Sequence, residues 1–233
     1  IITMIISTEN KNLTLKKLNH IDTMIEPIKD FFERFGLKMA AILLLIIASY
    51  RLTDIVMGPM ANPFYIDMGY TLSEIGYIVK VVALISTIIG VFVGGILIKK
   101  FGLYKSLLIG AFLVMITNLL FSYTAITDKN LTLLASIVAS DSLAAGIVGT
   151  VNITFLTSLV SQKYTGFQYA LLTSVMTFTG TIFKGFSGVI VESFQSLYGF
   201  NYGWMSFYIF TSCLALPAIL LIISKKGFFV NSD

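Results

Sequence analysis

Charged residues inside apolar stretches are the strongest chemical feature of this sequence. A charged side chain at the centre of a membrane helix costs about 2.5 to 3.5 kcal/mol on insertion scales, so it normally faces a partner or a water-filled cavity. Because cations outnumber carboxylates here, we expect a polar chamber suited to a small anionic solute. Mutual structural pairing of the same charges is the alternative interpretation. The residues are Arg51, Asp54, Lys80, Asp141 and Lys184.

Local spacing divides these charges into a pair and an excess of cations. Arg51 and Asp54 are three residues apart, so on a helix they share one face and partly neutralise each other. This leaves Lys80 and Lys184 as the predicted counter-charges for an anionic solute. The predicted substrate-binding residues are Arg51, Asp54, Asn62, Lys80 and Lys184.

Two aspartates are the intramembrane groups that could most readily bind and release a proton. Removing a carboxyl group from water favours its protonated form, so Asp54 and Asp141 are the predicted proton-coupling residues. Asp141 is the better candidate, because no basic residue lies within a helical turn of it in the sequence. A structural aspartate, hydrogen-bonded to Ser140, Ser142 or a facing helix, is the alternative interpretation.

The sequence offers little for covalent or metal chemistry. It holds one histidine, His20, and one cysteine, Cys213, which are too few for a disulfide framework or a cysteine-rich metal site. No nucleophile elbow or phosphate-binding loop occurs in it. We therefore expect no enzymatic activity, no metal and no cofactor.

The elements that must hold these charges are apolar helices. Of the 233 residues, 56% are hydrophobic and 12% are charged, about half the charged share of a soluble domain. This predicts an all-α polytopic membrane protein in contact with lipid, a bundle of six transmembrane helices over 37–224. Residues 1–36 are then a cytoplasmic tail or interdomain linker, and 225–233 a cytoplasmic C-terminal tail. The stretches with the roughly 20 apolar residues that a span needs are 37–63, 75–98, 106–126, 131–160, 167–191 and 202–224.

Basic residues predict the orientation of this bundle. On the side of the N-terminus lie twelve lysines and arginines, against Lys129 alone on the other. Since basic loops stay in the cytoplasm, we expect both termini to be cytoplasmic in a bacterial inner membrane. The net charge of +4 then serves orientation, and nucleic acid is not a predicted partner.

Prolines and an aromatic pair predict irregular places in the helices. The segment 58–63, with its glycine and two prolines, predicts a break in the outer part of the first span, and Pro217 predicts an interruption of the last. Residues 27–34 predict a short amphipathic helix with Phe31 and Phe32 on the membrane surface. A solvated linker is the alternative for this segment.

A weak internal repeat favours a transporter. The segment Gly95–Phe101, at the end of the second span, is echoed by Gly188–Phe194, at the end of the fifth. The first and fourth spans also share an aspartate followed by a glycine, Asp54 with Gly58 and Asp141 with Gly146. Inverted repeats place the binding site of many carriers near the membrane midplane. The sequence therefore predicts a three-plus-three arrangement of helices.

Several segments carry a resemblance to a known family. They are Pro27–Gly36, Tyr50–Gly69 with its continuation through Glu74 to Lys80, Gly94–Gly102, Ala139–Gly146 and Gln168–Leu172. In these segments, and over nearly the whole chain from about residue 27, the sequence resembles AmpG-type muropeptide permeases.

This resemblance implies a fold and a function. It implies the C-terminal half of a major facilitator fold, proton-driven import of anionic anhydro-muropeptides and a role in cell wall recycling. An N-terminal six-helix half is then the expected partner. Two alternatives stay open: a non-transporting membrane subunit or degraded gene fragment, and a carrier for another anionic solute such as a coenzyme A ester.

Overall fold

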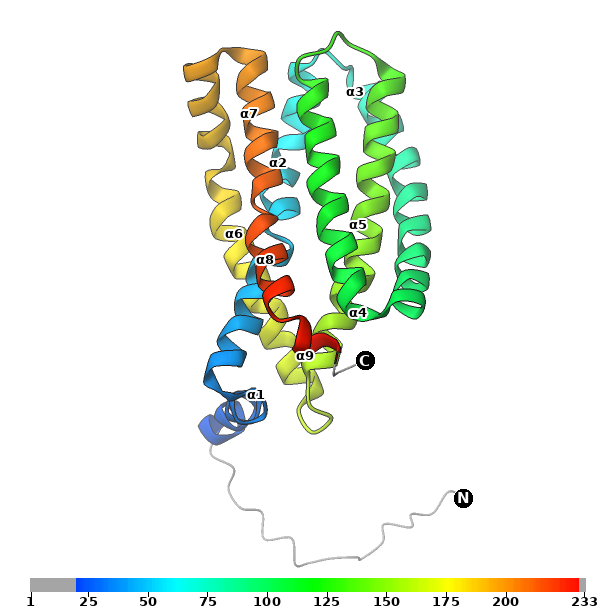
Figure 1. The fold of residues 1–233 in the computed structure, drawn as a ribbon. Coiled ribbons are helices and arrows are strands. Elements are labelled where there is room, and N and C mark those ends of the chain that lie inside the picture. Colours follow the sequence, from blue (N-terminus) through cyan, green and yellow to red (C-terminus); the bar gives the residue numbers. More distant parts are fainter. Residues whose placement is uncertain (1–19, 231–233) are drawn as a thin grey trace, which may run out of the picture.

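The computed structural model describes residues 20–230, all within or between helices. The predicted all-α bundle is confirmed, while residues 1–19 of the predicted tail and 231–233 lie outside the described residues. Figure 1 shows the helices running side by side along one axis. In chain order they are α1 (His20–Tyr50), α2 (Leu52–Asp67), α3 (Leu72–Tyr77), the π-helix η1 (Ile78–Val82), α4 (Ala83–Thr124), α5 (Leu131–Leu159), α6 (Thr165–Tyr198), α7 (Phe200–Cys213), α8 (Leu216–Ser224) and α9 (Lys226–Val230).

Five helical stretches of the described chain are long and apolar enough to cross a membrane: 25–67, 72–124, 131–159, 165–198 and 200–224. The second has 53 residues, roughly 80 Å of helix against a hydrocarbon core of about 30 Å. It bends back at Gly102, whose φ of 77° and ψ of 169° suit glycine. Figure 1 shows the two antiparallel legs of α4 that result. The stretch therefore covers both the second and the third predicted spans.

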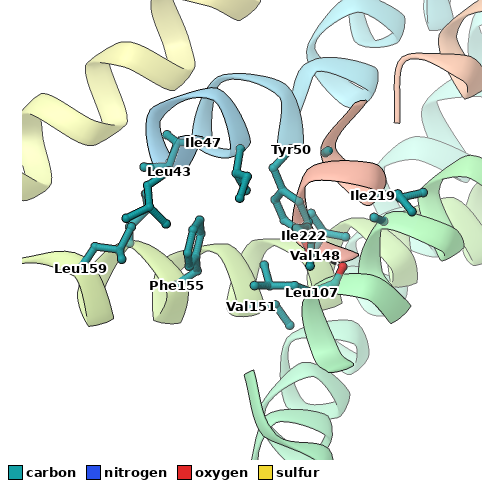
Figure 2. Packing of buried hydrophobic residues seen from close by; sticks show 14 of the residues in the cluster. Leu43, Ile47, Tyr50, Leu107, Val148, Val151, Phe155, Leu159, Ile219 and Ile222 are labelled. Atoms are coloured by element: carbon teal, nitrogen blue, oxygen red, sulfur yellow. Dashed lines mark hydrogen bonds between the residues drawn. The ribbon is translucent and has the colours of Figure 1, made fainter. Parts of the chain in front are cut away.

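The core at one end of the bundle joins four helices. Leu43 and Ile47 of α1 pack in one cluster with Leu107 of α4, Phe155 of α5 and Ile222 of α8. Figure 2 shows these side chains converging from separate segments of the chain. All five side chains are fully buried. This cluster fixes how α1 sits against α5, and so where the residues after Tyr50 emerge.

The contact between the first leg of α4 and α5 depends on two glycines. A Cβ atom on Gly90 would lie 2.2 Å from the carbonyl oxygen of Leu143, and one on Gly146 would lie 2.3 Å from that of Thr87. The two backbones therefore touch, as small residues permit in membrane helices. Gly95 lines no such contact, since a Cβ atom there would meet nothing within 4 Å.

The first turns of α1 are packed inside the protein, so the prediction that Phe31 lies on the membrane surface is wrong. Phe31 is 3% exposed and its ring centroid lies 5.0 Å from that of Phe35. The cause is the buried amide of Gln168 on α6. It accepts a hydrogen bond from Arg34 Nη2 at 2.9 Å and donates one to the carbonyl of Pro27 at 2.8 Å. This polar anchor pulls the segment against the loop between α5 and α6.

The predicted break at 58–63 is also wrong. Helix α2 continues through Pro59 and Pro63. Membrane helices tolerate proline where neighbouring helices, hydroxyl side chains or local adjustments satisfy the freed backbone groups. The discontinuity lies instead at Arg51, with φ of −107° and ψ of 7° between α1 and α2. The predicted interruption at Pro217 is confirmed, since α7 ends at Cys213 and α8 begins at Leu216.

Candidate functional site

A cavity of about 280 Å³ opens between α2, the junction of η1 with α4, and α5. Four of the predicted site residues line it: Arg51, Asp54, Asn62 and Asp141. Other polar groups on its wall come from Tyr65 and Ser142, and the apolar wall includes Val79, Ala83 and Val138.

Helical spacing explains why these residues meet. On α2 the lining positions Asp54, Gly58, Ala61 and Tyr65 recur every three or four residues, which is one face of a helix. On α5 the lining positions 138, 141, 142 and 145 follow the same spacing. Two helix faces therefore meet across the cavity, each with a carboxylate.

The pair expected from spacing is present. Arg51 Nη2 lies 3.6 Å from Asp54 Oδ2, and the two side chains are 32% and 20% exposed. Each side chain still has a polar atom without a hydrogen bond. Arg51 Nε and Asp54 Oδ2 are buried without a hydrogen-bond partner in the described part of the chain. Both residues line the cavity, so an entering polar solute could bind them there.

Asp141 is held by a residue that was not among the predicted site residues. Its Oδ1 accepts a hydrogen bond of 2.9 Å from the hydroxyl of Thr117, on the second leg of α4. The partner therefore comes from a facing helix, one of the alternatives left open for this aspartate. No local pattern marks Thr117, because it lies 24 residues away in the sequence.

Lys80 and Lys184 are not among the residues that line this cavity. Lys80 is exposed on η1, next to the lining residue Val79, in a five-residue π-helical stretch. Such stretches are frequent at functional sites. Lys184 is exposed on α6. The structure thus brings four of the predicted residues together and leaves both lysines on the surface of the described chain.

A second polar cluster joins the two connections that follow α2 and precede α5, the helices on either side of the cavity. Lys129 Nζ donates to Glu74 Oε2 at 2.9 Å, and Glu74 closes a capping box with Thr71 at the start of α3. The hydroxyl of Tyr70 donates to the carbonyl of Asn130 at 3.1 Å. These bonds join the α2–α3 and α4–α5 connections, so they hold α2 beside α5. Among the described residues, no group of three or more histidine, cysteine, aspartate or glutamate side chains is placed to hold a metal.

Comparisons with known proteins give the chain its relatives. No family model matches, and no solved structure matches. AmpG 4, a candidate transporter of Rickettsia conorii, is 33% identical over 224 residues, which are 94% of this chain and 51% of that protein. AmpG 4 of Rickettsia felis is 34% identical over 230 residues, 95% and 53% of the two chains. The anhydromuropeptide permease of Escherichia coli K12 is 30% identical over 202 residues, 86% and 39%.

These alignments cover most of the chain and about half of each Rickettsia relative. Together with the apolar helices they show a multi-pass membrane protein. The chain is a relative of the AmpG-type permeases, and it spans about half the length of the curated relatives it matches.

Proposed function

We propose that this chain is the C-terminal six-helix half of an AmpG-type carrier of the major facilitator fold. Its helices form three-plus-three inverted repeats, and it works with an N-terminal six-helix half. Together the halves import anionic peptidoglycan fragments, the anhydromuropeptides, across the bacterial inner membrane by proton symport. The Escherichia coli relative, named an anhydromuropeptide permease, supports this solute class.

The cavity at Arg51, Asp54 and Asp141 carries the proposal. A guanidinium binds a carboxylate with directed hydrogen bonds, so Arg51 is suited to the acidic group of the solute. Asn62 offers an amide that can pair with peptide or sugar groups. Asp141 supplies the exchangeable proton. The carboxylate of Asp54, 3.6 Å from the guanidinium of Arg51, partly neutralises its charge.

The size of the cavity supports a half-site. Ligand pockets usually enclose about 300 to 1,000 Å³, and this one has about 280 Å³, little for a sugar-peptide. A facing half would supply the remaining walls. In this arrangement Lys80 and Lys184, exposed in the described chain, contribute positive charge at the mouth that the solute passes.

The basic loops support the orientation. With the α5–α6 connection at Lys163 and the α4 bend at Lys99 and Lys100 on the side of the termini, both termini are cytoplasmic. The cavity is then reached from the periplasm in one conformation and from the cytoplasm in another, which is what a symporter requires.

Uptake in cells tests the proposal. The chain is co-expressed with an N-terminal six-helix half in cells that lack their own permease, and accumulation of labelled anhydromuropeptide is measured. We expect uptake, and at least a tenfold loss with Arg51→Gln, because the solute's carboxylate loses its charged partner. Lys105→Gln, which removes an exposed cation outside the cavity, serves as the matched control.

The same assay separates the alternatives. Competition by an unlabelled coenzyme A ester, with no competition by unlabelled muropeptide, would assign a different anionic solute. Full insertion of both halves without uptake would contradict the transporter assignment and favour a non-transporting subunit.

A further inference from the structure

A second hollow, of about 390 Å³, lies at the bend of α1, where α8 ends beside it. Its apolar lining comes from Phe35, Leu37, Met39 and Ile42 of α1. Its charged lining comes from Lys38 on the same helix and Lys225 at the end of α8. The hollow is separate from the cavity at Arg51 and Asp54, with which it shares no lining residue.

The backbone builds this hollow. At Gly36 the φ of 71° and ψ of 154° turn α1, so the segments before and after it diverge. Phe35, beside the bend, packs edge-to-face on Phe228 of α9 with ring centroids 5.9 Å apart. This contact ties the wall of the hollow to the C-terminal helix, which brings Lys225 toward Lys38.

The two lysines are charges without a protein counter-ion. Among the side chains that the structure describes, residues 25–229, neither Lys38 nor Lys225 has a hydrogen bond or an ion pair from its ammonium group. By contrast, Lys129 is paired with Glu74 at 2.9 Å. Both lysines line one hollow, so an anion bound there would be attracted by both charges.

The two lysines of the hollow lie at the ends of apolar helical runs, where a membrane helix meets lipid headgroups. Lys38 stands at the start of the apolar run of α1, and Lys225 directly follows the apolar helix α8. Lys225 lies between α8 and α9, at the end of the bundle where Figure 1 marks the C-terminus, and Lys38 lines the same hollow. Lysines at helix ends extend toward the membrane interface, and basic pockets between membrane helices bind anionic headgroups.

We propose that this hollow binds one anionic phospholipid. Lys38 and Lys225 bind its phosphodiester, and an acyl chain lies along Leu37 and Ile42. The apolar walls select a lipid over a free phosphate, because only the lipid fills both the charged and the apolar part. The site is independent of the solute and of the proposed transport function.

Binding to the full chain in detergent micelles tests the site. Native mass spectrometry measures retention of phosphatidylglycerol, with phosphatidylcholine of the same acyl chains and glycerol 3-phosphate as comparison probes. We expect phosphatidylglycerol to bind more tightly than either. In the double variant Lys38→Gln, Lys225→Gln its affinity should fall about thirtyfold, from the usual contribution of each basic residue near a lipid surface.

A matched control removes the same charge elsewhere. Lys99→Gln with Lys105→Gln deletes two exposed lysines at the α4 bend, outside the hollow, and should change the affinity less than threefold. Lys38→Arg with Lys225→Arg keeps both charges and should retain binding, which guards against a folding defect in the glutamine variant. An equal loss in both glutamine pairs, equal binding of phosphatidylcholine, or equally tight glycerol 3-phosphate would overturn the proposal.

Discussion

The hydroxyl of Thr117 lies within hydrogen-bond reach of two acceptors. One is Asp141 Oδ1 at 2.9 Å and the other is the carbonyl oxygen of Val114 at 3.1 Å. A hydroxyl has one hydrogen and can also accept. It can therefore donate to the carboxylate of an ionised Asp141, or donate to Val114 while it accepts from a protonated Asp141. Both protonation states of the aspartate are satisfied without a shift of α4 or α5, as a reversible proton site needs.

Replacement of Asp141 tests this role. Asp141→Asn should lower proton-driven accumulation of the solute at least tenfold, because an amide cannot exchange a proton while it keeps an oxygen that accepts from Thr117. The measurement is uptake in cells with the N-terminal half, under an imposed inward proton gradient. Asp128→Asn, an exposed aspartate in the α4–α5 connection, is the control. Accumulation unchanged by Asp141→Asn would rule out the proton role.

At the scale of the elements, backbone contact sets the geometry of the site. Gly90 and Gly146 let the first leg of α4 touch α5, and Gly146 lies about one and a half turns from the cavity residue Asp141 on the same helix. A side chain at this contact would push α5 away from the helices that complete the cavity. Packing of the glycines is thus coupled to the position of Asp141.

Alanine substitutions on α5 distinguish this contact from ordinary helix effects. Gly146→Ala should destabilise the protein by about 1 to 3 kcal/mol, the usual cost of overpacking, since its Cβ atom would lie 2.3 Å from a backbone oxygen. Gly149→Ala, on the same helix with nothing within 4 Å of its Cβ atom, should be neutral or slightly stabilising. Thermal unfolding in detergent measures both, and equal effects would argue against the close contact.

At the scale of the whole molecule, polar anchors lie at both ends of an apolar bundle. Gln168 joins the start of α1 to the α5–α6 connection. At the opposite end Lys129 is paired with Glu74, and the indole N–H of Trp204 donates to Asp67 Oδ2 at 2.9 Å. These anchors connect segments distant in sequence, so the described bundle is suited to move as one body.

Labelling of the two ends of α5 tests the orientation. In a Cys213→Ser background, Asp128→Cys and Lys163→Cys place a thiol at exposed positions before and after this helix. In intact cells a membrane-impermeant maleimide should label the Asp128 variant and leave the Lys163 variant unlabelled until the cells are opened, because basic loops are retained in the cytoplasm. The reverse pattern would place the termini in the periplasm.

The sequence by itself determined the features that depend on composition and on neighbours along the chain. Apolar runs gave the helical bundle, the three-residue spacing gave the pair of Arg51 with Asp54, and Pro217 gave the interruption between α7 and α8. A missing backbone donor and a shared helix face are local properties. Local motifs also carried the resemblance to AmpG-type permeases, and the relatives that the comparisons found confirm it.

Only the tertiary structure decided which of the predicted residues share the cavity. The rotation of each helix about its axis depends on contacts far apart in sequence, and these put Asn62 and Asp141 on the cavity while Lys80 and Lys184 lie outside its lining. The same kind of contact places Thr117 beside Asp141. It also buries Phe31, which the sequence predicted to lie on the membrane surface. An apolar span has no strong polar face to fix its rotation in advance, so packing of small residues and buried polar bonds had to settle it.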